Sequence, residues 1–164
     1  KSKHGNDAIF VVIDKLTEVA HFLPIKESIT TAQLVELCTS RIVSLHGIPQ
    51  LISSDRGSIF TSMFCDSFQK AMGTNIRFST AFHPQTIGQV ERVNQILEDM
   101  LRACVISFGM KWEDCLPYAE FSYNNSFQAS SGKAPFEILY GRKCRTPLNW
   151  SETGERQLPG NDLI

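Results

Sequence analysis

The sequence predicts an α/β fold, because short strand-like segments alternate with longer amphipathic segments along most of the chain. The run A-I-F-V-V-I-D at 8–14 is rich in β-branched residues and too apolar for a solvent-facing strand, so it predicts a buried strand. A strand, a helix and a second strand follow one another over 51–79, at the spacing of a parallel crossover. Together these observations favour an α/β fold over an all-α fold.

A β-hairpin and a helix are expected in the N-terminal part of the chain. The segment V-A-H-F-L-P at 19–24 is the expected hairpin partner of 8–14, with K-L-T-E between them. Thr30 or Thr31 can cap a helix that runs to about His46, where G-I-P ends it. The apolar residues of this helix lie at helical spacing: Leu34, Leu37, Cys38, Ile42 and Leu45.

The middle of the chain predicts a second strand–helix–strand unit. The segment L-I-S-S-D at 51–55 reads as a strand that ends on its aspartate. Thr61 or Ser62 opens a helix that Gly73 closes, and N-I-R-F-S at 75–79 is a further short strand. One face of that helix is apolar: Phe64, Phe68 and Met72.

The longest predicted helix runs from about Gly88 to Phe108, after a loop at 80–88. It carries a continuous apolar stripe of Val90, Val93, Leu97, Met100, Leu101, Cys104 and Val105. A further amphipathic helix is expected at 112–125, with Pro117 near its first turns.

The length of 164 residues fits one domain, which we assign to 1–145. Residues 146–164 are polar and rich in Pro and Gly, so they predict a linker towards a C-terminal domain. The chain does not begin with Met, so residue 1 is expected to be a cut inside a longer chain. There is no apolar run of about 18 residues and no signal-peptide pattern, so no membrane association is predicted.

The overall charge gives no support to nucleic-acid binding, because the net charge is −1. Only a local patch can supply such binding, and the one basic cluster, G-R-K-C-R at 141–145, is interpreted as a solvated turn. The five cysteines are scattered and form no C-x-x-C pair. This pattern indicates buried, reduced thiols of an intracellular protein rather than a disulfide framework or a zinc site.

Two carboxylates stand at the edges of predicted elements. Asp55 ends a strand, at the sheet edge where α/β proteins bind ligands, and Glu91 lies early in the longest helix. Carboxylates bind hard cations such as Mg²⁺, and two such ions can assist phosphoryl transfer. The alternative is structural: an aspartate in an exposed turn and a glutamate that favours the helix dipole. Composition and pattern alone favour this structural alternative.

The residues around both carboxylates resemble a known family. S-D-R-G-S-I-F at 54–60 and F-H-P-Q-T-I-G-Q-V-E-R-V-N-Q at 82–95 resemble the integrase catalytic core of LTR retrotransposons and retroviruses. Residues 56 to 90, 35 in number, separate Asp55 from Glu91, as in that family's signature. The similarity continues through L-E-D-M-L-R-A-C, W-E-D-C-L-P-Y-A-E-F-S-Y-N-N-S and A-P-F-E-I-L-Y-G-R-K-C-R, covers about 5–148, and resembles the gypsy-type branch. It reverses the preference for the structural alternative.

The resemblance implies an RNase H-like fold, with a mixed five-stranded sheet flanked by helices. It implies a polynucleotidyl transferase that depends on Mg²⁺ or Mn²⁺ at a two-metal site. Such an enzyme first trims the 3′ ends of the element's DNA, and the new 3′-hydroxyl then attacks target DNA. On this resemblance Asp55 is the second catalytic aspartate and Glu91 the catalytic glutamate, and both are metal ligands.

The resemblance also implies DNA contacts around Glu91. The loop 80–88 resembles the family's flexible active-site loop, in which His83 and Gln85 are expected to reach DNA. Asn94 and Gln95 follow Glu91 by three and four positions and are expected to meet the same DNA. The alternative for His83 is a loop histidine that bonds to the backbone.

The chain departs from the family at its start. The family carries a third carboxylate on its first strand, just before the K-S-K-x-G-N-D stretch, whereas this chain begins at K-S-K. Asp7 and Asp14 are the nearby aspartates, and neither is a good substitute. The first, central strand is therefore expected upstream of residue 1, which leaves 8–14 and 51–54 each with an unpaired edge. We expect the chain alone to be catalytically inactive and to fold poorly.

A second hypothesis is a degenerate or domesticated copy that binds DNA or protein without catalysis. Ile87 stands where gypsy-type elements usually carry Asp or Asn, and Gln95 and Glu98 stand where lentiviral relatives carry lysines. The spacing from Asp55 to Glu91 disfavours a ribonuclease H-type nuclease, and no cysteine has an identifiable base for Cys–His chemistry. The expected partners are retroelement DNA ends, target DNA and further copies of the chain, in the nucleus after a cytoplasmic virus-like particle.

Overall fold

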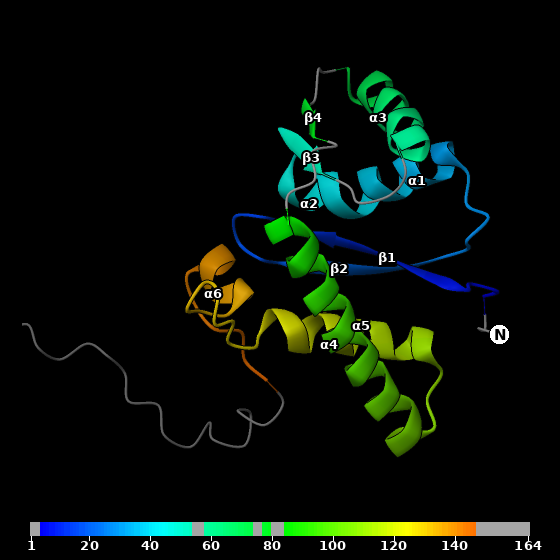
Figure 1. The fold of residues 1–164 in the computed structure, drawn as a ribbon. Helices are drawn as coiled ribbons and strands as arrows, with labels where there is room; N and C mark the ends of the chain where they lie inside the picture. The colour runs from blue at the N-terminus through cyan, green and yellow to red at the C-terminus, as the bar shows by residue number, and fades with distance from the viewer. Residues whose placement is uncertain (1–3, 54–57, 74–76, 80–83, 147–164) are drawn as a thin grey trace, which may run out of the picture.

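The computed structural model describes residues 4–53, 58–73, 77–79 and 84–146 (Figure 1). The strands are β1 (Ala8–Ile13), β2 (Ala20–Ile25), β3 (Leu51–Ser53) and β4 (Arg77–Ser79). The helices are α1 (Thr31–Cys38), α2 (Ser44–His46), α3 (Ser58–Met72), α4 (Pro84–Phe108), α5 (Trp112–Asn124) and α6 (Pro135–Tyr140). A π-helical segment, Thr39–Val43, joins α1 to α2.

The predicted hairpin is confirmed: β1 pairs with β2 in antiparallel register, from Ala8 opposite Ile25 to Ile13 opposite Ala20. Asp14 closes its turn, because its carboxylate accepts the Thr17 hydroxyl at 2.6 Å and the Leu16 N–H at 3.2 Å. These bonds hold the turn while Glu18 takes a left-handed backbone conformation, with φ of 60°.

The hairpin is the middle layer of the molecule, with helices on both sides (Figure 1). Successive residues of a strand point to opposite faces, and β1 shows this alternation. Ile9, Val11 and Ile13 pack into a core with α4 and α5, whereas Phe10 packs into a second core with α1 and α3. The buried members of the first core are Ala20, Phe22, Val93, Leu97, Leu116, Ala119 and Tyr123. Those of the second are Leu34, Val35, Cys38, Phe64, Cys65 and Phe68.

The second predicted pair of strands is also confirmed. β3 pairs with β4 in parallel, with Ser53 opposite Ser79, and α3 lies between them in the chain. The described strands form two separate two-stranded sheets, in which β1 bonds only to β2 and β3 only to β4. The expected unpaired edges of the strands at 8–14 and 51–54 agree with this topology.

The helix predicted from Thr30 or Thr31 to His46 begins as expected but is not regular throughout. Thr30 is its N-cap, and its hydroxyl accepts the Gln33 N–H at 3.3 Å. The π-helical segment interrupts it where the Thr39 hydroxyl donates to the Val35 carbonyl at 2.8 Å. Hydroxyls that bond to the preceding turn perturb a regular helix, and the apolar pattern alone did not reveal this.

One boundary and one helix in the C-terminal half also differ from the prediction. α4 begins at Pro84, so residues 84–88 are helical and do not belong to the loop predicted at 80–88. Proline suits the first turn of a helix, where its missing N–H has no partner to lose. α6 was not predicted, although Pro135 at its start, Glu137 on the Ala134 N–H at 2.9 Å and a left-handed Gly141 are ordinary helix signals. Among the described residues, no helix combines the length and apolar character that a membrane span needs.

Candidate active site

The structure brings Glu91, Asn94 and Gln95 to one exposed face of α4. Residues three and four positions apart on a helix are neighbours, so the carboxylate and the two amides lie close together. Val93 and Leu97 lie on the side of the helix that faces the core and are almost fully buried, with 2% and 4% of their surfaces exposed. The apolar side therefore fixes how the helix turns Glu91 to solvent.

The other predicted site residues are only partly accounted for. Asp55 and His83 lie outside the described residues, and Gln85 lies in the first turn of α4 with its side chain outside the description. The parallel pairing sets Ser53 and Ser79 side by side, at the carboxyl edge of β3 and β4. From that edge the chain continues to Asp55, two residues after Ser53, and to α4. Ligands of α/β sheets bind at such an edge.

The Glu91 carboxylate fits a hard divalent cation. It is exposed and forms no ion pair with any described residue. Mg²⁺ takes one or two carboxylates and keeps part of its water shell. No group of three or more metal-binding side chains occurs among the described residues, which do not include Asp55. The two-metal site therefore stays a prediction.

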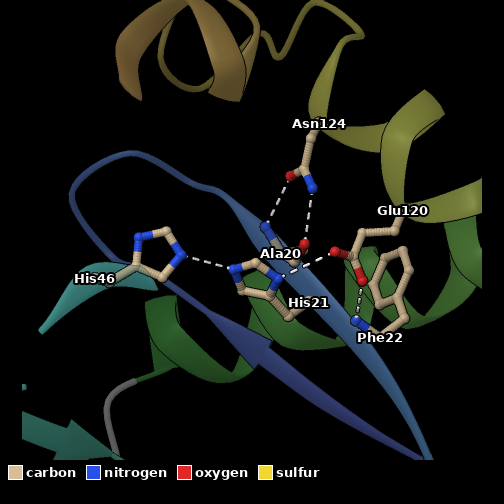
Figure 2. Close-up of polar contacts among 6 residues, drawn as sticks. All are labelled: Ala20, His21, Phe22, His46, Glu120 and Asn124. Carbon is tan, nitrogen blue, oxygen red and sulfur yellow. Dashed lines mark hydrogen bonds and ion pairs between the residues drawn. The ribbon is translucent and has the colours of Figure 1, made fainter. Parts of the chain in front are cut away.

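Helix α5 supports the sheet through a buried amide that sequence reasoning missed. Asn124 is fully buried, and its side chain accepts the Ala20 N–H at 2.8 Å and donates to the Ala20 carbonyl at 2.8 Å (Figure 2). Glu120, one turn earlier, accepts the Phe22 N–H at 2.8 Å. These side chains bond to β2 in the place that a neighbouring strand would otherwise take.

The same helix holds both ends of the chain's described part. Glu113 is buried and accepts the Asn6 side-chain amide at 2.6 Å. Asn125 bonds in both directions to the backbone of Cys144, at 3.1 Å each, and so holds the exposed basic turn of 141–145 against α5. A signal for this role was available, because Glu113, Glu120 and Asn124 recur at helical spacing on a face that also carries buried apolar residues.

All five cysteines are free; Cys38, Cys65 and Cys115 are buried as predicted, whereas Cys104 and Cys144 are only partly buried. Burial raises the pKa of the Cys38 thiol to about 11. The pKa of Cys115 is also raised, mainly by burial and to a smaller extent by the neighbouring Cys104. Only the thiolate is a nucleophile, so these two thiols are inert near neutral pH.

No family model matches the chain. Among curated proteins it is similar to the Transposon Tf2-3 and Tf2-4 polyproteins of Schizosaccharomyces pombe, with 34% identity to each over 136 residues. The match takes in 83% of this chain and 10% of each polyprotein. The chain thus spans about a tenth of the length of these relatives.

Solved structures of integrase cores have the same fold. The BIV integrase catalytic core is 26% identical, with a TM-score of 0.63, over 81% of this chain and 85% of that one. The trimeric form of the HTLV-2 integrase catalytic core with magnesium is 22% identical, with a TM-score of 0.61, over 79% of this chain and 82% of that one. The chain in the simian T-cell lymphotropic virus intasome is 21% identical, with a TM-score of 0.65, over 84% of this chain and 50% of that one.

These likenesses agree with the motifs around Asp55 and Glu91 and with the layered α/β arrangement. The RNase H-like fold follows from the solved structures, and the homology to retrotransposon polyproteins is consistent with the gypsy-type branch. The chain belongs to the retroviral integrase superfamily, as an integrase catalytic core of the retrotransposon kind.

Proposed function

We propose that the chain is the catalytic core of an integrase that joins the DNA ends of a retroelement to target DNA. The observation that carries the proposal is the exposed carboxylate of Glu91, which lies with Asn94 and Gln95 on one face of α4 in an integrase-core fold. Metal-assisted phosphoryl transfer uses carboxylates that hold divalent cations, and the exposed carboxylate of Glu91 is available for this role.

In this proposal Asp55 and Glu91 would be among the ligands of two Mg²⁺ or Mn²⁺ ions. Such ions, when bound, stabilise the attacking and the leaving oxygens of an in-line displacement at phosphorus. Water is the nucleophile in 3′-end trimming, and the new 3′-hydroxyl is the nucleophile in strand transfer. His83, Gln85, Asn94 and Gln95 position the DNA, because imidazole and amide side chains can bond to phosphate oxygens and base edges.

The proposed setting is a retroelement polyprotein, like those of the curated relatives. We infer that the core acts as a homo-multimer on DNA, in the nucleus after a cytoplasmic virus-like particle. Solved relatives include dimeric and trimeric forms and an intasome, which supports a multimeric arrangement. Asn94 and Gln95 of α4 and the basic residues Arg142, Lys143 and Arg145 are exposed, so they are accessible to DNA.

A strand-transfer assay tests the proposal, with a labelled DNA end, a target plasmid and Mg²⁺ or Mn²⁺. It compares the chain with a version extended upstream in its gene, each with Glu91→Gln and with Glu98→Gln as the matched control. Glu98 is exposed on the same helix, two turns beyond Glu91, so both substitutions remove one surface carboxylate. We expect joining only by the extended version, its loss in Glu91→Gln and its retention in Glu98→Gln.

Binding of the same DNA, measured by fluorescence anisotropy, separates the two hypotheses. Joining by Glu91→Gln at the unmodified rate would contradict the assigned role. If the folded extended version binds DNA and joins none, the non-catalytic hypothesis is correct instead.

A further inference from the structure

We propose that His21, His46 and Glu120 form a clasp that depends on a single shared proton and ties the end of α2 to α5 across β2. The three residues come from three elements, and their side chains converge at the outer edge of the hairpin (Figure 2). The proposal goes beyond the proposed integration reaction and does not require it.

The contacts form a continuous chain. Glu120 Oε1 lies 3.1 Å from His21 Nδ1, and His21 Nε2 lies 2.8 Å from His46 Nε2. The two imidazole rings are inclined by 51°, with their centroids 5.0 Å apart. The side chains of His21 and Glu120 are only 14% and 26% exposed, so water competes weakly for the first of these bonds.

Hydrogen-bond chemistry determines the proton count. The carboxylate of Glu120 is an acceptor, so His21 Nδ1 carries the donated proton. A bond between two Nε2 atoms then needs one N–H and one lone pair, whichever ring supplies the proton. When both rings are imidazolium, two N–H groups of like charge face each other and the bond is lost.

The charged groups around the clasp act in different directions. Partial burial lowers the pKa of His46, the charge of His21 lowers it further, and Asp14 in the hairpin turn opposes both. Because the folded-state pKa of His46 is lowered, the unfolded chain takes up this proton first as the pH falls. The stability from the clasp is therefore present above about pH 6.5, the ordinary histidine pKa, and is lost as the pH falls through the folded-state pKa of His46.

The corner that the clasp holds has little other anchorage. α2 contributes no buried residue, and the apolar residues Leu45, Ile48 and Leu51 are 67%, 44% and 52% exposed. His46 is the last residue of α2, and Gly47 with φ of 79° turns the chain towards β3. Opening of the clasp therefore frees the connection into β3.

The first experiment is a ¹H–¹⁵N NMR titration of the histidine rings in the chain, in His21→Gln and in His4→Gln. His4 is exposed and lies outside the cluster, so it is a matched control. We expect the His46 midpoint to rise towards about 6.5 in His21→Gln, the value of a free histidine, and to stay unchanged in His4→Gln. An unchanged midpoint in His21→Gln would overturn the proposal.

The second measurement is amide hydrogen exchange of residues 44–53 at pH 7.5 and pH 5, corrected for the intrinsic pH dependence of exchange. The clasp predicts that protection of this segment is lower at pH 5 than at pH 7.5, because the lowered pKa of His46 makes the folded state lose stability as the pH falls. In His46→Gln the carboxamide can donate to a neutral His21 ring or accept from its imidazolium, so this loss of protection should disappear. Equal pH dependence in the two proteins would show that no shared-proton clasp operates. Neither measurement uses integrase activity, so failure of the proposed function leaves both results interpretable.

Discussion

The two outer edges of the β1–β2 hairpin differ in whether other side chains satisfy their backbone groups. In an antiparallel pair, the backbone groups of successive residues point alternately towards the partner strand and away from it. The Asp14 N–H bonds to the Val19 carbonyl at 2.9 Å, and this bond fixes which residues face β1. The backbone groups of Ala20, Phe22 and Pro24 therefore point away from β1. Asn124 takes both backbone groups of Ala20, Glu120 takes the Phe22 N–H, and Pro24 has no N–H. The edge of β2 is thus closed by side chains of one helix and by a proline.

Within the described part of the chain, no side chains cover the edge of β1 in this way. The same alternation turns the backbone of Ile9, Val11 and Ile13 away from β2, and none of these groups has a partner among the described residues. A groove of about 420 Å³ lies between β1 and α4, lined in part by Ile9, Val11, Leu97, Leu101 and Trp112. The comparison teaches that polar residues of a helix can replace a strand as edge protection, provided that their spacing matches the strand.

The largest expected loss of stability comes from removing an N–H group of β1 that faces β2, compared with one that faces away. Val12→Pro removes an N–H that bonds to β2, whereas Val11→Pro removes one that points away from it. We expect Val12→Pro to cost more than about 3 kcal/mol of unfolding free energy and Val11→Pro clearly less. Urea unfolding followed by circular dichroism measures both. Equal losses would contradict the assigned orientation of the ladder.

The next effect tests the closed edge directly. Asn124→Ala removes two hydrogen bonds and leaves the N–H and carbonyl of Ala20 buried without a partner. The expected loss is about 2–4 kcal/mol of unfolding free energy. Asn125→Ala is the control, because Asn125 is less buried and holds a peripheral segment, and its expected cost is about 1 kcal/mol. If urea unfolding gives the two variants equal stability, the strand-like role of Asn124 is wrong.

A smaller loss is expected for Glu120→Gln. The carboxamide oxygen can still accept the Phe22 N–H, but it cannot also accept from His21 with the strength of a charged group. We expect a loss of about 1–2 kcal/mol in unfolding free energy at pH 7.5. Glu137→Gln serves as a control that changes a capping carboxylate elsewhere. A Glu120→Gln protein as stable as the unmodified chain would show that the charge adds nothing at this edge.

The smallest effect concerns Pro24. Pro24→Ala adds an N–H to the edge of β2 without removing any hydrogen bond, because the proline is exposed and donates none. Stability should change by less than about 1 kcal/mol, while self-association should increase because the new donor can pair with another chain. Light scattering over a concentration series measures this increase. An unchanged monomer fraction would mean that α5 alone protects the edge.

Local patterns were sufficient for most elements of the fold. Residues 8–14 and 19–24 formed the predicted hairpin, Thr30 capped the predicted helix, and the crossover over 51–79 was parallel, as expected. Each of these signals acts over a few residues, through β-branched runs, capping hydroxyls or apolar spacing. α6 and the start of α4 at Pro84 were not predicted from the sequence. Both carry proline or capping residues that are helix signals, but the surrounding segments have an irregular pattern that is typical of loops.

For the candidate site, the sequence alone determined the polar face of Glu91, Asn94 and Gln95, because helical spacing decides which residues share a face. It did not reveal the closed edge of β2 or the clasp of His21, His46 and Glu120. Those contacts join residues separated by 25 to 104 positions, as in His21 with His46 and Ala20 with Asn124. Only tertiary packing decides them, because a polar side chain acquires a partner only when the cores around Phe22 and Phe68 have brought distant elements together.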